Sequence, residues 1–438
     1  MQVYPNDLLK EIKLIWPTLN MQPNGKGPTL PSNKILLELL ETVYHASFLT
    51  EESRKLSVRI LFSTFEEIKS QFDSPIFKDR KAFIKFENNR PFTKGEILRL
   101  APATDPEKML IGVELDTKNN LTIWGLADIG SSWWKFIHGQ SSGGAPPPDA
   151  LIISSTNPGN LTISREGTII LNLNGGKINK PMSGIFYGGP IYDFFKSSHN
   201  SFYQEVCKSL KTKKFDSHDD DYPIRKFIEF LERLIFNIRS SHHGGTLIIV
   251  PDSINTADER LKDRINIKYS TDFNKPWDIL IKSLVTHKEY YKYYFKLRHS
   301  KKLIKPDDFA TESVLQWSHE QIEDSIEDIN RFISSLSAID GAVVITDKYR
   351  LLGYGAEVIV NSPSLTHVHI AEDIEGIKLN KISIESYGTR HRSAFRFCSS
   401  YEDSLAIIIS QDGGVKAVKR CGQKVLLWPD INEGDYGI

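Results

Sequence analysis

Hydrophobic residues recur with two different periods along the first half of the chain. Between residues 31 and 70 they lie three or four positions apart, as on one helix face, and Pro31 and Ser32 suit a helix start. From about residue 81 to 196 the apolar runs shorten and are separated by Gly, Asn-Pro-Gly and Asn-Gly-Gly, which are turn signals. The strands expected there are KAFIKF, MLIGVEL, LTIWGLADI, ALIISS, LTIS and TIILNL. A helical segment followed by a mostly β module is therefore predicted.

The second half alternates helices with apolar strands. An amphipathic helix is expected to end at Gly244-Gly245, before a buried strand at 246–250. A helical segment with much irregular chain is predicted for 275–317, and a regular helix from Ser318, which has capping-box spacing with Gln321. Further strands are predicted around 342–345, 349–353, 405–410, 415–420 and 424–428. This alternation predicts an α/β fold with a mixed sheet covered by helices.

Length and charge pattern suggest where the domains meet. A chain of 438 residues is expected to form two or three domains. In KTKKFDSHDDDYP (211–223) a basic run meets an acidic run and ends in proline, which is typical of a linker. We therefore expect an N-terminal module at 1–215, helical over 1–75 and mostly β over 80–195, and a second domain at 222–438.

The overall composition excludes several classes of protein. Lys+Arg and Asp+Glu both number 55, so the whole chain has no charge excess for nucleic acid, although a local basic patch stays possible. The cysteines Cys207, Cys398 and Cys421 are scattered without CxxC spacing, which argues against a zinc site or disulfide framework and fits a reducing compartment. The start of the chain lacks signal-peptide features, and no apolar run approaches the ~18 residues of a membrane span. A soluble, cytoplasmic protein is expected.

Two short motifs could carry chemistry. In Asp340-Gly341-Ala342 a carboxylate stands at the mouth of an apolar strand, where sheets often bind ligands, and Gly341 would let a ligand approach the backbone. The alternative is a turn aspartate at the strand entry. In 388–394 (GTRHRSA) a helix is predicted to start with Thr389 as its cap, so that two arginines, a histidine and free backbone amides converge. Such a group suits a polyanion such as phosphate, and the alternative is a solvated basic helix start.

Taken together, these motifs resemble the paired DGA and RHR signatures of the diadenylate cyclase (DAC) domain. The two motifs lie about fifty residues apart in the family's order, and the strands at 245–250 and 405–410 resemble those of the family. The resemblance covers about residues 222–430. LRLAPATDPEKMLIGVEL and LTIWGLADIG, continued by Trp133-Trp134, resemble sensor-like domains that precede some bacterial DAC domains.

The resemblance implies an enzyme that joins two ATP molecules into cyclic di-AMP and releases pyrophosphate. Asp340 would help hold Mg²⁺ or Mn²⁺ and activate the attacking 3′-hydroxyl, while Gly341 and Ala342 line the nucleotide. The RHR segment would bind the triphosphate, through Gly388, Thr389, Arg390, His391 and Arg392. Each site holds one ATP, so facing catalytic domains in a homodimer or higher oligomer are expected. The N-terminal half would regulate the reaction in response to an unknown small molecule or protein.

The sequence departs from the family pattern in two places. Where many members carry an acidic pair, this chain has Ser410-Gln411-Asp412, and Asp412 either supplies a metal ligand or is only a turn residue beside Gly413-Gly414. An adenine-contacting Leu-Pro-Leu-like segment is replaced by 355–359 (GAEVI), which would place Glu357 against the nucleotide and changes base recognition. A catalytically silent nucleotide or cyclic-dinucleotide sensor is the alternative function.

Three further features have structural explanations as well as functional ones. Residues 288–302 interleave aromatic and basic side chains, which suits a nucleic-acid surface, a dimer contact, a cover for the site or a buried aromatic helix face. His242-His243 could suggest a metal site but fits a helix C-terminus better, and Trp133-Trp134 fits core packing better than ligand stacking.

Overall fold

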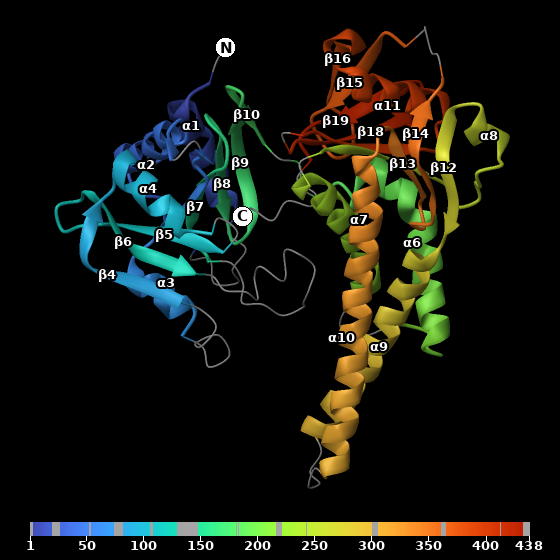
Figure 1. Ribbon diagram of the computed structural model, residues 1–438, viewed down its shortest axis with the longest axis horizontal. Coiled ribbons are helices and arrows are strands. Elements are labelled where there is room, and N and C mark those ends of the chain that lie inside the picture. Colours follow the sequence, from blue (N-terminus) through green and yellow to red (C-terminus); the bar gives the residue numbers. More distant parts are fainter. Residues whose placement is uncertain are drawn as a thin grey trace. The chain divides into compact units, whose positions relative to one another are not determined.

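The computed structural model describes residues 3–19, 27–51, 54–73, 82–105, 108–128, 148–180, 182, 184–215, 221–241, 243–299, 305–360, 365–411 and 413–431. The chain forms two compact units, Met1–Pro181 and Met182–Gly434. Each unit is a mixed α/β structure built on one large sheet (Figure 1), as predicted for the fold class. No described helix combines the length and hydrophobicity that a membrane span requires.

The first unit contains an eight-stranded sheet in the order β10-β9-β8-β7-β3-β5-β6-β4. Its strands are β3 (Val58–Phe62), β4 (Ala82–Pro91), β5 (Met109–Leu115), β6 (Leu121–Asp128), β7 (Leu151–Ser155), β8 (Leu161–Arg165), β9 (Thr168–Asn174) and β10 (Lys177–Asn179), and β1 (Thr50–Glu51) pairs separately with β2 (Arg54–Lys55). The helices are α1 (Pro5–Ile15), α2 (Asn33–Ala46), α3 (Phe65–Gln71) and α4 (Lys94–Leu100), with 3₁₀ turns η1 (Trp16–Leu19) and η2 (Ala101–Ala103).

Helices α1, α2 and α4 contribute to one core of this sheet, and α3 contributes to a smaller core that includes Trp124. The helical period predicted between residues 31 and 70 holds for α2, whose apolar positions are buried. It fails at 58–62, because Val58–Phe62 is a buried strand that pairs with both β5 and β7. A five-residue apolar run is too short to show whether its period is that of a helix or of a strand.

The second unit contains a nine-stranded sheet in the order β12-β14-β13-β11-β17-β18-β19-β15-β16. Its strands are β11 (Gly245–Val250), β12 (Ile265–Phe273), β13 (Ala342–Thr346), β14 (Leu351–Val358), β15 (His367–Ala371), β16 (Leu379–Ser383), β17 (Leu405–Ile409), β18 (Val415–Cys421) and β19 (Lys424–Trp428). The helices are α6 (Gly189–Ser209), α7 (Tyr222–Ser240), α8 (Glu259–Lys262), α9 (Lys275–Arg298), α10 (Pro306–Ser335) and α11 (Thr389–Ser400), with 3₁₀ turns η3 (Leu336–Ala338) and η4 (Ile384–Ser386).

Alternate residues of the central strands supply two cores on opposite faces of this sheet. Val343 and Ile345 of β13 join the core that includes α6, α7, α9 and α10. Ala342 and Val344 join the core under α8 and α11. This separation follows from the two-residue period of a strand, and it holds α11 against one face of the sheet (Figure 1).

Three boundaries differ from those expected. The division between the compact units falls at 181/182, not within 211–223, because the amphipathic α6 packs into the core of the second unit. Residues 275–298 form one continuous helix, where a helical segment with much irregular chain was expected. The helix expected from Ser318 begins twelve residues earlier at Pro306, so Ser318 lies inside α10 and is no cap. Favourable capping-box spacing occurs by chance within a long polar helix, and the proline at the first position gives the true start.

Candidate functional site

Strand β13 places Asp340 and Asp347 at opposite ends of the second unit's sheet, and we name the two ends after them. β11 and β13 are parallel, with Leu247 opposite Val343, while β17 is antiparallel to β11, with Gly245 opposite Ile409. The Asp340 end therefore holds the starts of β11 and β13 and the finish of β17. The Asp347 end holds the opposite termini of the same three strands.

The entry to β13 requires a glycine. Gly341 has φ +111°, a conformation that L side chains rarely adopt, and a Cβ there would lie 2.7 Å from the backbone N of Ala356. Ala342 pairs directly with Ala356 and is buried. The tight contact between β13 and β14 leaves Asp340 exposed just outside the sheet.

Helix α11 begins as predicted at the RHR segment, with one change at its start. The N-cap is Gly388, without a side-chain cap, and Thr389 is the first helical residue. Thr389 therefore does not occupy the cap position predicted for it. The first backbone N–H groups of an α-helix have no partner within the helix, and here no N-cap side chain accepts from them. Gly388, Thr389 and Arg390 are exposed, so this helix start can receive an anion.

Arg390 reaches the Asp340 end of the sheet. Its Nη1 donates to the carbonyl oxygen of Ile409, at 3.4 Å, and lies 2.8 Å from where a Cβ on Gly244 would be. Since β11 lies between β13 and β17, the guanidinium and the β13 entry are separated by two strand spacings, or about 10 Å. Sequence reasoning treated Gly244 only as a helix stop. Two features explain the glycine better than a helix stop does. Gly244 has φ +63°, and a side chain at this position would collide with the guanidinium of Arg390.

The other two residues of the RHR segment point elsewhere, because consecutive helical positions lie about 100° apart around the axis. His391 packs between the rings of Tyr387 and Phe395, with centroid distances of 5.4 and 6.3 Å. Arg392 pairs with the exposed carboxylate of Glu385 at 3.2 Å. Of the three RHR side chains, Arg390 is therefore the one that lies at the Asp340 end of the sheet. Among the described residues, Asp340 makes no direct contact with Arg390, His391 or Arg392.

One other predicted site residue, Glu357, lies near this end. Glu357 follows Ala356, the partner of Ala342, and is exposed. Asp412 lies outside the described residues, as do Trp133, Trp134 and His242. On either side of Asp412 the chain turns back on itself, with the Ser410 N–H donating to the Gly414 carbonyl at 2.8 Å and the Gly413 N–H to the Ser410 carbonyl at 3.0 Å. A hairpin turn between β17 and β18 was predicted here.

The Asp340 end can accept a phosphate chain together with a hydrated divalent cation. Asp340 has no hydrogen bond or ion pair among the residues that the structure describes, so its carboxylate is available. The described part of the chain has no group of three or more His, Cys, Asp or Glu side chains that could hold a metal. One carboxylate is still a suitable donor set for Mg²⁺, which keeps several waters and takes its other ligands from substrate phosphates.

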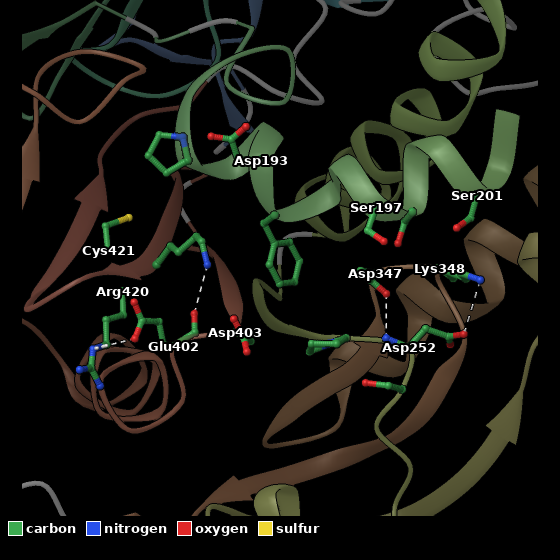
Figure 2. Close-up of a pocket in the computed structure, with 16 residues that line it drawn as sticks. Asp193, Ser197, Ser201, Asp252, Asp347, Lys348, Glu402, Asp403, Arg420 and Cys421 are labelled. Carbon is green, nitrogen blue, oxygen red and sulfur yellow. Dashed lines mark hydrogen bonds and ion pairs between the residues drawn. The ribbon is translucent and has the colours of Figure 1, made fainter. Parts of the chain in front are cut away.

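The Asp347 end contains a cavity of about 750 Å³ between α6 and the sheet (Figure 2). Its acidic and basic side chains come from α6, from the ends of β11, β13 and β18, and from the start of β17: Asp193, Asp252, Asp347, Lys348, Glu402, Asp403, Lys419 and Arg420. Asp252 and Asp347 follow the carboxyl ends of two parallel strands. That placement is a known indicator of ligand sites, which sequence reasoning did not apply to them.

Most charges at the Asp347 end have protein partners. Arg350 donates to the Asp252 carboxylate at 2.9 Å and to the carbonyl oxygens of Asp252 and Ile254 at 2.6 and 2.8 Å. The Asp252 N–H donates to the Asp347 carboxylate at 2.8 Å. Burial raises the pKa of Asp347, although hydrogen bonds from Ser198 and Asp252 oppose the shift. Lys348 lies 4.0 Å from Asp252, and Arg420 lies 3.9 Å from Glu402, contacts drawn in Figure 2.

The chain matches a known protein family, in a segment of the first unit. Residues 26–128 match the family described as the probable sensor domain DACNV. No curated protein and no solved structure matches the chain. The match supports the predicted sensor domain in the N-terminal half.

Proposed function

We propose that the protein is a diadenylate cyclase, whose second unit condenses two ATP molecules into cyclic di-AMP and whose first unit regulates that reaction. The observation that carries the proposal is the placement of Arg390 and the β13 entry at the same end of one sheet, about 10 Å apart. The match of residues 26–128 to a sensor domain associated with diadenylate cyclases supports the same assignment.

The roles of the residues follow from their positions. The guanidinium of Arg390 and the exposed start of α11 bind the triphosphate, because a forked donor and free backbone N–H groups both match phosphate oxygens. Gly341 and Ala342 let the nucleotide lie against the β13 entry. Asp340 would hold Mg²⁺ or Mn²⁺, and the ion would supply positive charge opposite the phosphates. The same carboxylate would orient the attacking 3′-hydroxyl.

The reaction needs two nucleotides that face each other. Each 3′-oxygen forms a bond to the α-phosphorus of the other ATP, the bond from that phosphorus to pyrophosphate breaks, and two pyrophosphates and two protons leave. Alignment of the reactants supplies on the order of 7–11 kcal/mol of the lowering of the barrier. With one nucleotide in each chain, the active form is a dimer with facing Asp340 ends.

The direct test is incubation of the purified full-length chain with ATP and Mg²⁺ or Mn²⁺, followed by liquid chromatography and mass spectrometry. A product with the mass and retention of cyclic di-AMP, formed with two equivalents of pyrophosphate, is expected. Folded protein that yields no dinucleotide from any of the four ribonucleoside triphosphates, with either metal, would refute catalysis.

A silent nucleotide sensor is the second candidate function. It is favoured by the directions of His391 and Arg392, which contact Tyr387 and Glu385, and by the exposed Glu357 in place of an apolar adenine contact. Calorimetry separates the two functions. Binding of ATP or cyclic di-AMP without turnover supports the sensor, and turnover supports the cyclase.

A further inference from the structure

Helices α9 and α10 form a hairpin whose outer part extends beyond the rest of the second unit (Figure 1). At about 1.5 Å per residue, the 30-residue α10 is about 45 Å long. The two helices are joined near the tip by the ion pair of Arg298 with Glu312, at 3.0 Å, and by a hydrogen bond from Tyr293 to Asp308, at 3.2 Å. The hairpin does not belong to the site at the Asp340 end.

The base of the hairpin is fixed to the body of the unit. Lys226 of α7 pairs with Glu323 of α10 at 2.6 Å, and Asn330 donates to the carbonyl of Phe230 at 2.8 Å. Burial opposes the charge of Lys226, but its acidic neighbours prevail and raise its pKa, so the buried pair stays ionised. A base held this way gives the projecting part a defined direction.

The two helices carry opposite charge. α9 has six Lys or Arg residues against two Asp or Glu, whereas α10 has eight Asp or Glu against one Arg. Much of this charge lies on exposed positions, with Lys292 and Lys296 on α9 and Glu320 and Asp324 on α10. A chain with no net charge therefore concentrates a positive stripe and a negative stripe on one projecting hairpin.

Each stripe also carries exposed apolar side chains. On α10, Val314 and Trp317 are 64% and 63% exposed. On α9, the rings of His287, Tyr291, Phe295 and His299 form a ladder with centroid spacings of 4.4, 6.2 and 6.0 Å, and Phe295 is 53% exposed. Large apolar side chains of this kind, bordered by charge, are typical of protein–protein contacts, in which Trp and Tyr supply most of the binding energy.

We propose that this hairpin binds a second copy of the same chain, with the acidic Trp317 stripe of α10 packed against the basic Tyr291–Phe295 stripe of α9. Charge complementarity selects this partner, because each copy carries both the positive and the negative surface that the contact needs. The contact is independent of the facing arrangement at the Asp340 end, and it does not rest on the proposed catalysis.

The same charges argue against an anionic polymer or membrane surface. The aromatic and basic side chains of α9 would suit nucleic acid by themselves. They stand beside the exposed carboxylates of α10, such as Glu320 and Asp324, which would repel phosphates at close range. The hypothesis of a nucleic-acid surface at 288–302 is therefore less favoured than self-association.

Sedimentation of the full chain over a range of concentrations tests the inference. Trp317→Ala is expected to weaken association about tenfold or more, without unfolding, because the side chain is mostly exposed. The matched control is Ile377→Ala, which removes another exposed apolar side chain, 77% exposed, outside the hairpin and should change nothing. If Trp317→Ala leaves the assembly unchanged, the inference is overturned.

Charge reversal tests the choice of partner. Lys292→Glu with Lys296→Glu should weaken self-association, as should Glu320→Lys with Asp324→Lys. Combining all four reversals should restore it, since the two stripes are again opposite. Failure of the fourfold variant to regain association would overturn the inference. So would an oligonucleotide that binds the wild-type chain and competes with its self-association. Each variant is also assayed for dinucleotide synthesis, and loss of the hairpin contact without loss of product would separate this contact from catalysis.

Discussion

The two ends of the nine-stranded sheet hold similar side chains in different electrostatic environments. At the Asp347 end, Asp252 accepts from Arg350 and lies near Lys348, and its own N–H donates to Asp347. At the Asp340 end, Asp340 has no partner in the described part of the chain, and Arg390 has only a carbonyl oxygen at 3.4 Å. Charges already neutralised by the protein stabilise the fold, whereas charges left unpaired at a sheet end are available to a ligand.

This difference in charge pairing favours the Asp340 end, which holds the DGA and RHR motifs, over the cavity at the Asp347 end as the proposed nucleotide site. The cavity has a volume of about 750 Å³, and concavity alone would favour the Asp347 end as a ligand site. Two of its carboxylates, however, are already bonded within the protein: Asp347 accepts from Ser198 of α6, and Asp252 pairs with Arg350 after the β13–β14 turn. Four substitutions, three of them compared with a second variant, test the environments of these side chains.

The largest effect is expected at the unpaired carboxylate. Asp340→Asn should reduce dinucleotide synthesis by more than about a thousandfold, because the charge that holds the metal is lost. The melting temperature of the Asp340→Asn variant should stay near that of the wild type, since no described protein group pairs with Asp340. Asp403→Asn is the matched control, an exposed carboxylate at the other end, and should keep full activity. Equal losses in both variants would remove the distinction between the ends.

The next effect concerns stability at the Asp347 end. Arg350→Met should lower the free energy of unfolding by about 3 kcal/mol, because Asp252 and two carbonyl oxygens lose their donor. Arg392→Met breaks an ion pair with the exposed Glu385 and should cost less than about 1 kcal/mol. Urea denaturation followed by circular dichroism measures both. If Arg392→Met lowered the free energy of unfolding as much as Arg350→Met, the conclusion that the stabilising charges lie at the Asp347 end would be wrong.

A smaller, pH-dependent effect is expected from His199 on α6. The buried ring contacts those of Tyr192, Phe195 and Phe227, and neither nitrogen has a hydrogen-bond partner in the described residues. Burial lowers its pKa from 6.5 to about 4. As pH falls, the unfolded chain therefore binds a proton at this residue at a higher pH than the folded chain does. The free energy of unfolding should decrease as pH drops from about 6.5 toward 4, by about 2 kcal/mol at pH 5.

Substitution isolates this contribution. His199→Phe keeps the aromatic packing and should remove that part of the acid destabilisation when urea unfolding is measured at pH 7.5 and pH 5. The wild type and the variant share all other titrating groups, including the buried His287 with its pKa lowered to about 4, so the difference between them reports His199. Parallel pH profiles for the two proteins would show that His199 does not titrate in this way.

The smallest effect is expected for a conservative change on α11. Arg390→Lys keeps the charge but loses the forked donor, so KM for ATP should rise about tenfold with a smaller change in kcat. Arg420→Lys, at the Asp347 end, should leave both constants unchanged. A similar rise in KM for Arg420→Lys would place the nucleotide in the cavity.

Several local features were predictable because they depend on neighbouring residues. The strands at 109–115, 121–128 and 424–428 follow from short apolar runs between turn residues. The exposed strands β12 and β16 were not predicted, because few of their side chains are buried and their sequence carries little apolar signal. Helix α9 was predicted only as part of a helical segment with much irregular chain, since its aromatic and basic composition masks the helical period.

By itself, the sequence determined that the second half is α/β and that the first half combines helices with a mostly β module. It also determined that residues 339–345 join a helix to a strand, and that a helix starts at the RHR segment. Only the tertiary structure decided that Arg390, and not His391 or Arg392, turns toward the end of the sheet where Asp340 lies. It also decided that Asp252 is paired with Arg350 and Asp347 accepts hydrogen bonds, while Asp340 has no partner among the described residues. Strand order and side-chain direction depend on pairings between residues far apart in the chain, which no local pattern records.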